Sequence, residues 1–137
     1  MVKLLLTFLL TLSTTLASAQ GPGVVYHITT GLDTVAAAMS NIQNHLSADP
    51  KVKIVVVTNG PGIDFLISDA KDSKGREFSG AVADLAGQGV EFRVCNNTLV
   101  TSNLDPDSLL MESTLVPSGV AEAARLQLKQ GFAYIKP

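Results

Sequence analysis

Ile54-Val55-Val56-Val57 is the stretch that decides the fold class of this 137-residue chain. These four residues form a β-branched run without polar alternation. Such a strand is typically buried on both faces, as in a parallel sheet that helices cover on both sides. Helical and strand patterns alternate on either side of it. The sequence therefore predicts an α/β fold, a three-layer α/β/α sandwich with a mainly parallel five-stranded sheet.

The other elements follow from hydrophobic periodicity and turn residues. We expect five strands, at 24–28, 52–57, 90–95, 113–116 and 133–136. A helical stripe after the first strand predicts a helix that Asp33 or Thr34 caps; its apolar members are Val35, Ala38, Met39, Ile42 and Leu46. A short helix is expected over 63–67, a solvated charged loop over 68–77 and a second long helix over 78–88. Residues 96–109 are expected to form a polar loop that ends in a helical turn.

The last helix is expected to begin after Ser118, which caps it, and to reach about Gln130. Four apolar residues fall within one third of its circumference and are expected to cover the sheet: Val120, Ala121, Ala124 and Leu128. Leu126 lies at about 240° from Val120 on a helix of 3.6 residues per turn. It is therefore expected to be exposed, on the side of Ala123.

Composition excludes several classes of protein. Hydrophobic residues make up 46% of the chain and charged residues 16%, which is not the composition of a disordered chain. The net charge is −2 and no basic stretch occurs, so no nucleic-acid partner is expected. The chain has one cysteine, which excludes an intrachain disulfide and a CxxC metal site.

The first nineteen residues have the layout of a secretory signal peptide. Lys3 supplies a positive charge, an uncharged run follows over 4–16, and Ala17-Ser18-Ala19 is a small-x-small cleavage site. The alternative is an uncleaved anchor, but the run is shorter than the roughly 20 residues of a membrane span. We expect a mature domain of residues 20–137, periplasmic or secreted, with no stable membrane insertion after cleavage.

The loops after the strands point to one edge of the sheet. In a parallel sheet the carboxyl ends of all strands share an edge, where ligands bind. The candidate ligand-binding residues near that edge are Asn59, Gly60, Gly62, Arg93, Asn96, Asn97, Thr98 and Ser118. Backbone N–H groups at helix N-termini can hold an anion there, although glycine and asparagine are also what tight turns require. No loop matches a phosphate-binding fingerprint, and no cofactor is expected.

Cys95 is the candidate catalytic residue because it ends the third strand. A thiol beside a helix start or a cation has a lowered pKa, and Arg93 projects from the same face of the strand. The alternative is a buried, inert thiol. His27 and His45 have no second ligand at metal spacing, so both are interpreted as structural and no metal is expected.

The chain resembles a known family at three places. They are Phe92-Arg93-Val94-Cys95-Asn96-Asn97-Thr98-Leu99, the Asn59–Gly62 loop, and a tail that includes Val116–Val120 and Gly131–Pro137. This set is similar to the DsrE/DsrF-like (YchN-type) family over nearly all of 23–137. The resemblance implies a three-layer fold, trimers or hexamers, and sulfur relay through a cysteine persulfide. By that resemblance Cys95 carries the sulfur.

Two functions remain open from the sequence. The first is an exported sulfur-relay protein in which Cys95 accepts a sulfane sulfur and passes it to a partner thiol. Its partners would be a sulfur donor, an acceptor protein and further copies of itself, with Leu126 near a subunit contact. The second is a non-enzymatic oligomeric module that binds a small anion or nucleotide-like ligand at the sheet edge.

Overall fold

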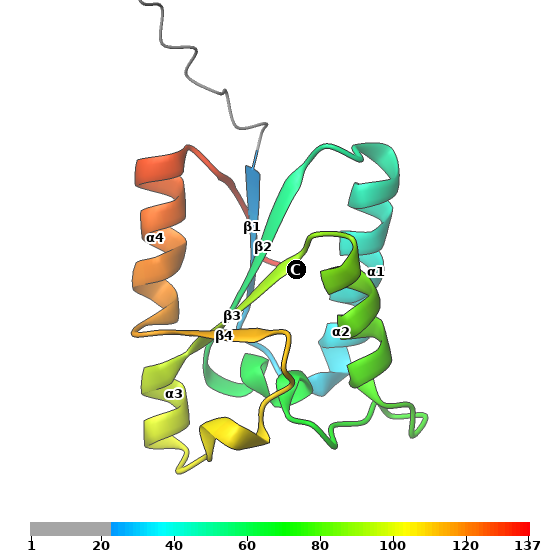
Figure 1. Ribbon diagram of the computed structural model, residues 1–137, viewed down its shortest axis with the longest axis vertical. Helices are drawn as coiled ribbons and strands as arrows, with labels where there is room; N and C mark the ends of the chain where they lie inside the picture. Colours follow the sequence, from blue (N-terminus) through cyan, green and yellow to red (C-terminus); the bar gives the residue numbers. More distant parts are fainter. Residues whose placement is uncertain (1–22) are drawn as a thin grey trace, which may run out of the picture.

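The fold is a five-stranded parallel sheet between two helical layers. The computed structural model describes residues 23–137; the predicted signal peptide and the start of the mature chain lie outside these residues. All neighbouring strands pair in parallel, in the order β4-β3-β2-β1-β5 (Figure 1). The strands are β1 Gly23–Ile28, β2 Lys53–Thr58, β3 Glu91–Cys95, β4 Ser113–Val116 and β5 Ala133–Ile135. The predicted fold class is confirmed.

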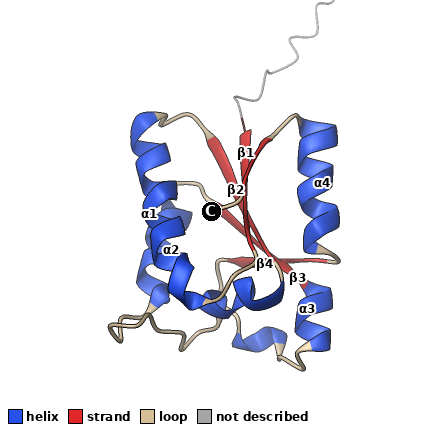
Figure 2. Ribbon diagram, turned by 180° about the vertical axis from the view of Figure 1, so that it is seen from behind, coloured by secondary structure: helices blue, strands red, loops and turns tan. Residues whose placement is uncertain are grey.

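The helices divide between the two faces of the sheet. Helix α1 (Leu32–Ala48) and α2 (Phe78–Gly87) cover one face, and α4 (Gly119–Gln130) covers the other (Figure 2). The short helix α3 (Asn96–Thr101) directly follows β3. Two 3₁₀ helices, η1 (Gly60–Leu66) and η2 (Pro106–Ser108), complete the described chain. In this part of the chain no helix is both long enough and apolar enough to cross a membrane.

Strand β2 is buried on both faces, as its sequence predicts. Each residue of Ile54–Val57 is at most 1% exposed. Alternate side chains of a strand point to opposite faces. Ile54 and Val56 therefore join the core beneath α1 and α2, while Val55 and Val57 join the smaller core beneath α4. The central strand thus ties the two layers together.

The first helix confirms its predicted stripe but not its predicted cap. All five residues of that stripe are buried in α1. The residue before the helix is Gly31, which has no side chain to cap it. The Thr34 hydroxyl instead donates to the Gly31 carbonyl oxygen at 3.2 Å. Asp33 and Thr34 are already within the first turn, so neither is the cap.

Residues 96–109 differ from the predicted polar loop. Helix α3 occupies Asn96–Thr101, while η2 is the helical turn expected near Pro106. Helix α3 has six residues and buries only Leu99. A single buried position produces no periodic pattern in the sequence, which is why the pattern indicated a loop. The turn after β2 also tightens at once into η1 from Gly60 onward.

The orientation of α4 is the reverse of the expected one. Gly119, Ala123 and Leu126 are the buried residues, and Leu126 is 0% exposed. Val120 and Leu128, which were expected to cover the sheet, are 60% and 82% exposed. The expectation that Leu126 lies near a subunit contact is therefore wrong, because this side chain fills the core beneath α4.

An ion pair explains this rotation of α4. Glu122 is 11% exposed and accepts from the Arg93 guanidinium of β3. Helix positions three and four apart lie on one side of a helix. Once Glu122 faces Arg93, Gly119, Ala123 and Leu126 face the sheet with it. Hydrophobic periodicity could not identify this polar contact.

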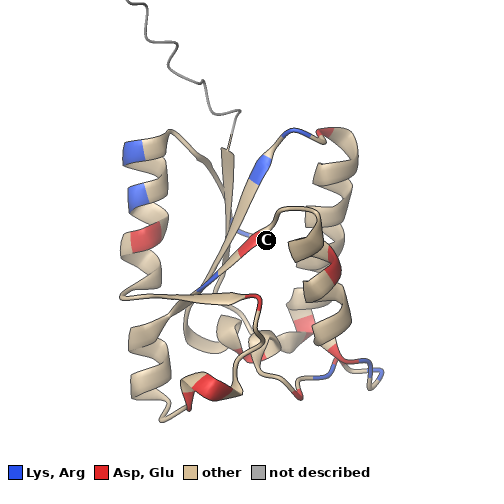
Figure 3. Cartoon of the chain, in the orientation of Figure 1, with Lys and Arg blue, Asp and Glu red and all other residues tan. Residues whose placement is uncertain are grey.

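Charged residues gather away from the sheet in the loop between η1 and α2, as expected. Figure 3 shows both signs of charge in this loop. Asp72 organises it by accepting from the N–H groups of Lys74 and Arg76, at 2.8 and 2.9 Å. Arg76 also pairs with the Asp72 carboxylate at 2.7 Å.

Candidate functional site

Three segments meet at the carboxyl edge of the sheet, around Cys95. The position of a Cβ on Gly119 would lie 3.2 Å from the Cβ atoms of both Asn59 and Cys95. It would also lie 3.0 Å from the carbonyl oxygen of Thr58. The start of α4 therefore packs directly on the ends of β2 and β3. Any side chain at this position would crowd these three atoms, so glycine allows the closest approach.

The loop after β2 is held against β1 by a second close contact. A Cβ on Gly62 would overlap the backbone of Ile28, so this position also requires glycine. Gly60 has a φ of +56°, a left-handed conformation that glycine adopts readily. These two glycines, predicted from the sequence as ligand residues, shape the loop so that the Gly60 N–H reaches Thr98 of α3.

The Cys95 sulfur lies in a cradle of hydrogen-bond donors. Cys95 is 5% exposed and immediately precedes α3. Burial raises the pKa of the Cys95 thiol, but hydrogen bonds outweigh it and hold the pKa below its ordinary value. The donors are the Gly119 N–H, the hydroxyl and N–H of Thr98, and the Asn97 N–H. Donors that favour the charged form of a group stabilise the thiolate.

Thr98 links the cradle to the loop after β2. Its hydroxyl oxygen accepts from the Gly60 N–H at 3.0 Å. A hydroxyl that accepts from a backbone N–H retains its own proton for another acceptor. The proton of Thr98 is thus available to the Cys95 sulfur, and this hydroxyl is among the groups that lower the pKa of Cys95.

Arg93 pairs with two glutamates and is not among the groups that lower the pKa of Cys95. Its guanidinium is 16% exposed and donates to Glu91 and Glu122. Glu122 also pairs with Arg125 at 2.8 Å. Hydrogen bonds from Arg125 and Arg93 outweigh burial and lower the pKa of Glu122 from 4.5 to about 2. The geometry thus assigns Arg93 to the orientation of α4, and the cradle donors account for the lowered pKa of Cys95.

The remaining predicted residues have different roles at this edge. The Ser118 hydroxyl caps α4 by accepting from the Ala121 N–H at 3.4 Å. Asn97 is exposed and Asn96 half-buried, and Asn97 serves the cradle through its backbone N–H. Gly119 was missed as a site residue. Its signal in the sequence was a glycine directly after a helix cap, where a side chain would ordinarily be tolerated.

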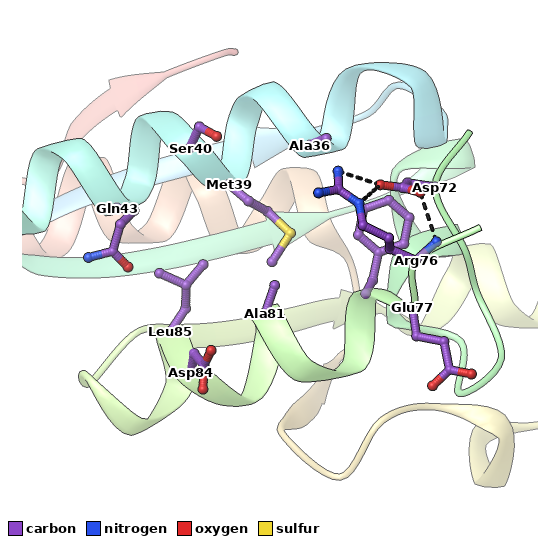
Figure 4. Close-up of a pocket in the computed structure, with 11 residues that line it drawn as sticks. Ala36, Met39, Ser40, Gln43, Asp72, Arg76, Glu77, Ala81, Asp84 and Leu85 are labelled. Carbon is purple, nitrogen blue, oxygen red and sulfur yellow. Dashed lines mark hydrogen bonds and ion pairs between the residues drawn. The ribbon is translucent and has the colours of Figure 1, made fainter. Parts of the chain in front are cut away.

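A separate groove lies on the other side of the sheet. It has a volume of about 360 Å³ and lies between α1 and α2 (Figure 4). Met39 and Leu85 line its floor, while Asp72, Arg76 and Asp84 bring charge to its rim. Within residues 23–137, no three His, Cys, Asp or Glu side chains gather as a metal site. The groove contains no sulfur nucleophile and is not continuous with the Cys95 cradle across the sheet.

Fold and site together define a class: a small parallel α/β/α domain with a single cysteine held at the carboxyl edge of its sheet. The chain belongs to the DsrE/DsrF-like family, whose model matches residues 20–137. That family is generally associated with sulfur relay.

Two solved structures are similar to this chain. The protein of unknown function MTH1491 from Methanobacterium thermoautotrophicum is 39% identical, with a TM-score of 0.76; the match covers 85% of this chain and 99% of that one. The YchN protein of E. coli is 10% identical, with a TM-score of 0.70 and the same coverage, and shows the fold alone. No curated protein matched the chain.

Proposed function

We propose that this protein is an exported sulfur carrier in which Cys95 holds a persulfide. The observation that carries the proposal is the cradle around the Cys95 sulfur. Donors from the starts of α3 and α4 and from the Thr98 hydroxyl favour the thiolate, and the thiolate is the nucleophilic form of cysteine. The sulfur-relay association of the family supports the same chemistry.

The transfer takes place in two balanced exchanges. The Cys95 thiolate attacks the outer sulfur of a donor persulfide; a new S–S bond forms, the donor S–S bond breaks, and the donor leaves as a thiolate. A partner thiolate then attacks the outer sulfur on Cys95 and releases Cys95 as a thiolate. No net oxidation occurs. Because Cys95 is 5% exposed, the transfer requires a partner thiol to reach the outer sulfur, which lies about 2 Å beyond Sγ.

Intact-mass spectrometry tests the carrier function. The purified protein, incubated with inorganic polysulfide, should gain the mass of one sulfur atom, and dithiothreitol should remove it. Cys95→Ser should gain none. Failure of the wild-type protein to gain sulfur would favour the alternative in which the sheet edge binds a small anion and Cys95 is structural.

Export is part of the proposal and has its own test. Ala17-Ser18-Ala19 would be cleaved, so the mature chain would begin at Gln20. N-terminal sequencing of the protein recovered from the periplasm or the medium should read from Gln20. Retention of Met1 on the folded protein would refute cleavage, and with it export by this route.

We also propose a homo-oligomer, a trimer or hexamer, with the contact moved to the outer face of α4. This face exposes Val120 and Leu128 together with Ala121 and Ala124. It is the apolar stripe that was expected to face the sheet, and a second copy would cover it. Multi-angle light scattering should give a mass of several chains, and Leu128→Glu should lower it. A single-chain mass for the wild type would refute the assembly.

A further inference from the structure

Each of the two histidines is paired with a tyrosine, on opposite faces of the sheet. His45 accepts from or donates to the Tyr26 hydroxyl at 3.0 Å beneath α1. His27 contacts the Tyr134 hydroxyl of β5 at 2.8 Å and is 7% exposed. Among residues 23–137, only His27 of these two histidines has a further side-chain partner, Asn59, at the carboxyl edge of the sheet. Asn59 therefore connects His27 to the loop that contacts the Cys95 site.

The protons of His27 can be assigned from its partners. Nε2 lies 2.5 Å from Oδ1 of Asn59, and an amide oxygen only accepts. Nε2 therefore carries a proton. In the neutral ring Nδ1 is then the acceptor, and the Tyr134 hydroxyl donates to it. The ring is held from both sides, and in turn it holds the Asn59 side chain in place.

Asn59 connects this pair to the cysteine through the backbone. The next residue, Gly60, donates its N–H to the Thr98 hydroxyl oxygen at 3.0 Å. This leaves the Thr98 proton available to the Cys95 sulfur, whose pKa the same hydroxyl helps to lower. Loss of the Gly60 contact would free Thr98 to accept from the thiol instead. A hydroxyl that accepts from the thiol favours the neutral form of Cys95, and one that donates favours the thiolate.

We propose that His27 is a positioning residue for Cys95. By holding Asn59 it keeps the Gly60 N–H on Thr98, so that the Thr98 hydroxyl donates to the Cys95 sulfur. This role rests on the sulfur-carrier function proposed above and extends the interpretation of His27 as a structural histidine. It assigns no contact between His27 and the transferred sulfur.

The test is a pH titration of Cys95 in the full-length protein. Thiolate absorbance in the ultraviolet, with the Cys95→Ser spectrum subtracted, reports the one cysteine of the chain. His27→Phe keeps an aromatic ring and removes both hydrogen bonds. In this variant the titration midpoint of Cys95 should rise by about half a pH unit to one unit. This is the effect of weakening one hydrogen bond to a charged group. His27→Gln restores an N–H donor for Asn59 and should recover at least half of the shift.

His45→Phe is the matched control. It removes the Tyr26 hydrogen bond on the opposite face and should leave the midpoint of Cys95 unchanged. Equal midpoints in His27→Phe and the wild type, with cooperative unfolding retained, would overturn the proposal. Equal upward shifts in His27→Phe and His45→Phe would overturn it too, because they would reflect a general loss of stability.

A second variant keeps the test decisive if His27→Phe does not fold. Asn59→Ala removes the acceptor without altering the buried strand and should raise the midpoint in the same direction; no rise would overturn the proposal. The titration does not depend on sulfur loading. Wild-type protein that takes up sulfur while these variants leave the midpoint unchanged refutes only the role of His27. Wild-type protein that takes up none refutes the carrier function.

Discussion

Gly119→Ala should raise the pKa of Cys95 and destabilise the fold, because the added methyl group would crowd three neighbouring atoms. Its Cβ would lie 3.0 Å from the Thr58 carbonyl oxygen and 3.2 Å from the Cβ atoms of Asn59 and Cys95. Carbon atoms in good contact are about 3.5–4.0 Å apart. The start of α4 must therefore move back by a few tenths of an ångström, and the Gly119 N–H moves away from the sulfur with it.

Two effects on stability oppose each other in this variant. Overpacking of a close contact costs about 1–3 kcal/mol, while alanine is favoured over glycine within a helix by about 1 kcal/mol. A net destabilisation of about 1 kcal/mol remains. A hydrogen bond to a charged group contributes about 1.5–3 kcal/mol, and one pKa unit corresponds to about 1.4 kcal/mol. Partial loss of the Gly119 donor should thus raise the pKa of Cys95 by about half a unit to one unit.

Urea denaturation and thiolate absorbance measure the two effects in the same samples. Gly80→Ala is the matched control, since Gly80 also lies in the first turn of a helix but has no atom within 4 Å of its Cβ position. It should stabilise the protein slightly and leave the Cys95 midpoint unchanged. If Gly119→Ala behaved like Gly80→Ala in both measurements, the close packing of α4 on Cys95 would be refuted.

Three further predictions concern α4 and the cradle. Leu126→Ala should cost about 2–5 kcal/mol of unfolding free energy in urea. In the dissociated single chain, where Leu128 is 82% exposed, Leu128→Ala should cost less than about 0.5 kcal/mol; similar costs would contradict the orientation of α4. The pKa of Glu122 is lowered to about 2, so its stabilising contribution is complete above about pH 4.5 and is lost as the pH falls toward 2. The thermal midpoint of Glu122→Gln should lie below that of the wild type at pH 7 and approach it across this interval, and a constant gap would speak against the ion pair. Thr98→Val should raise the Cys95 midpoint in the absorbance titration by about half a unit to one unit, and an unchanged midpoint would remove the hydroxyl from the cradle.

The candidate site was partly predictable. The carboxyl ends of parallel strands share an edge, so the convergence of Cys95 and the Asn59–Gly62 loop followed from the strand pattern alone. The roles within the site did not. Arg93 projects from the same face of the strand as Cys95, as alternation predicts. Its guanidinium nevertheless pairs with Glu122, which lies 29 residues further along the chain. A contact between residues so far apart leaves no local pattern.

By itself the sequence determined the α/β class, the buried central strand and the apolar face of α1. These features depend on hydrophobic periodicity within one segment, and that signal is local. Only the tertiary structure decided which side of α4 faces the sheet and which groups surround the sulfur. Helix α4 carries apolar residues on two sides, and the ion pair between Glu122 and Arg93 of β3 fixes which side faces the sheet. The Gly119 N–H reaches Cys95 because distant segments pack closely together at a position where a side chain would be crowded.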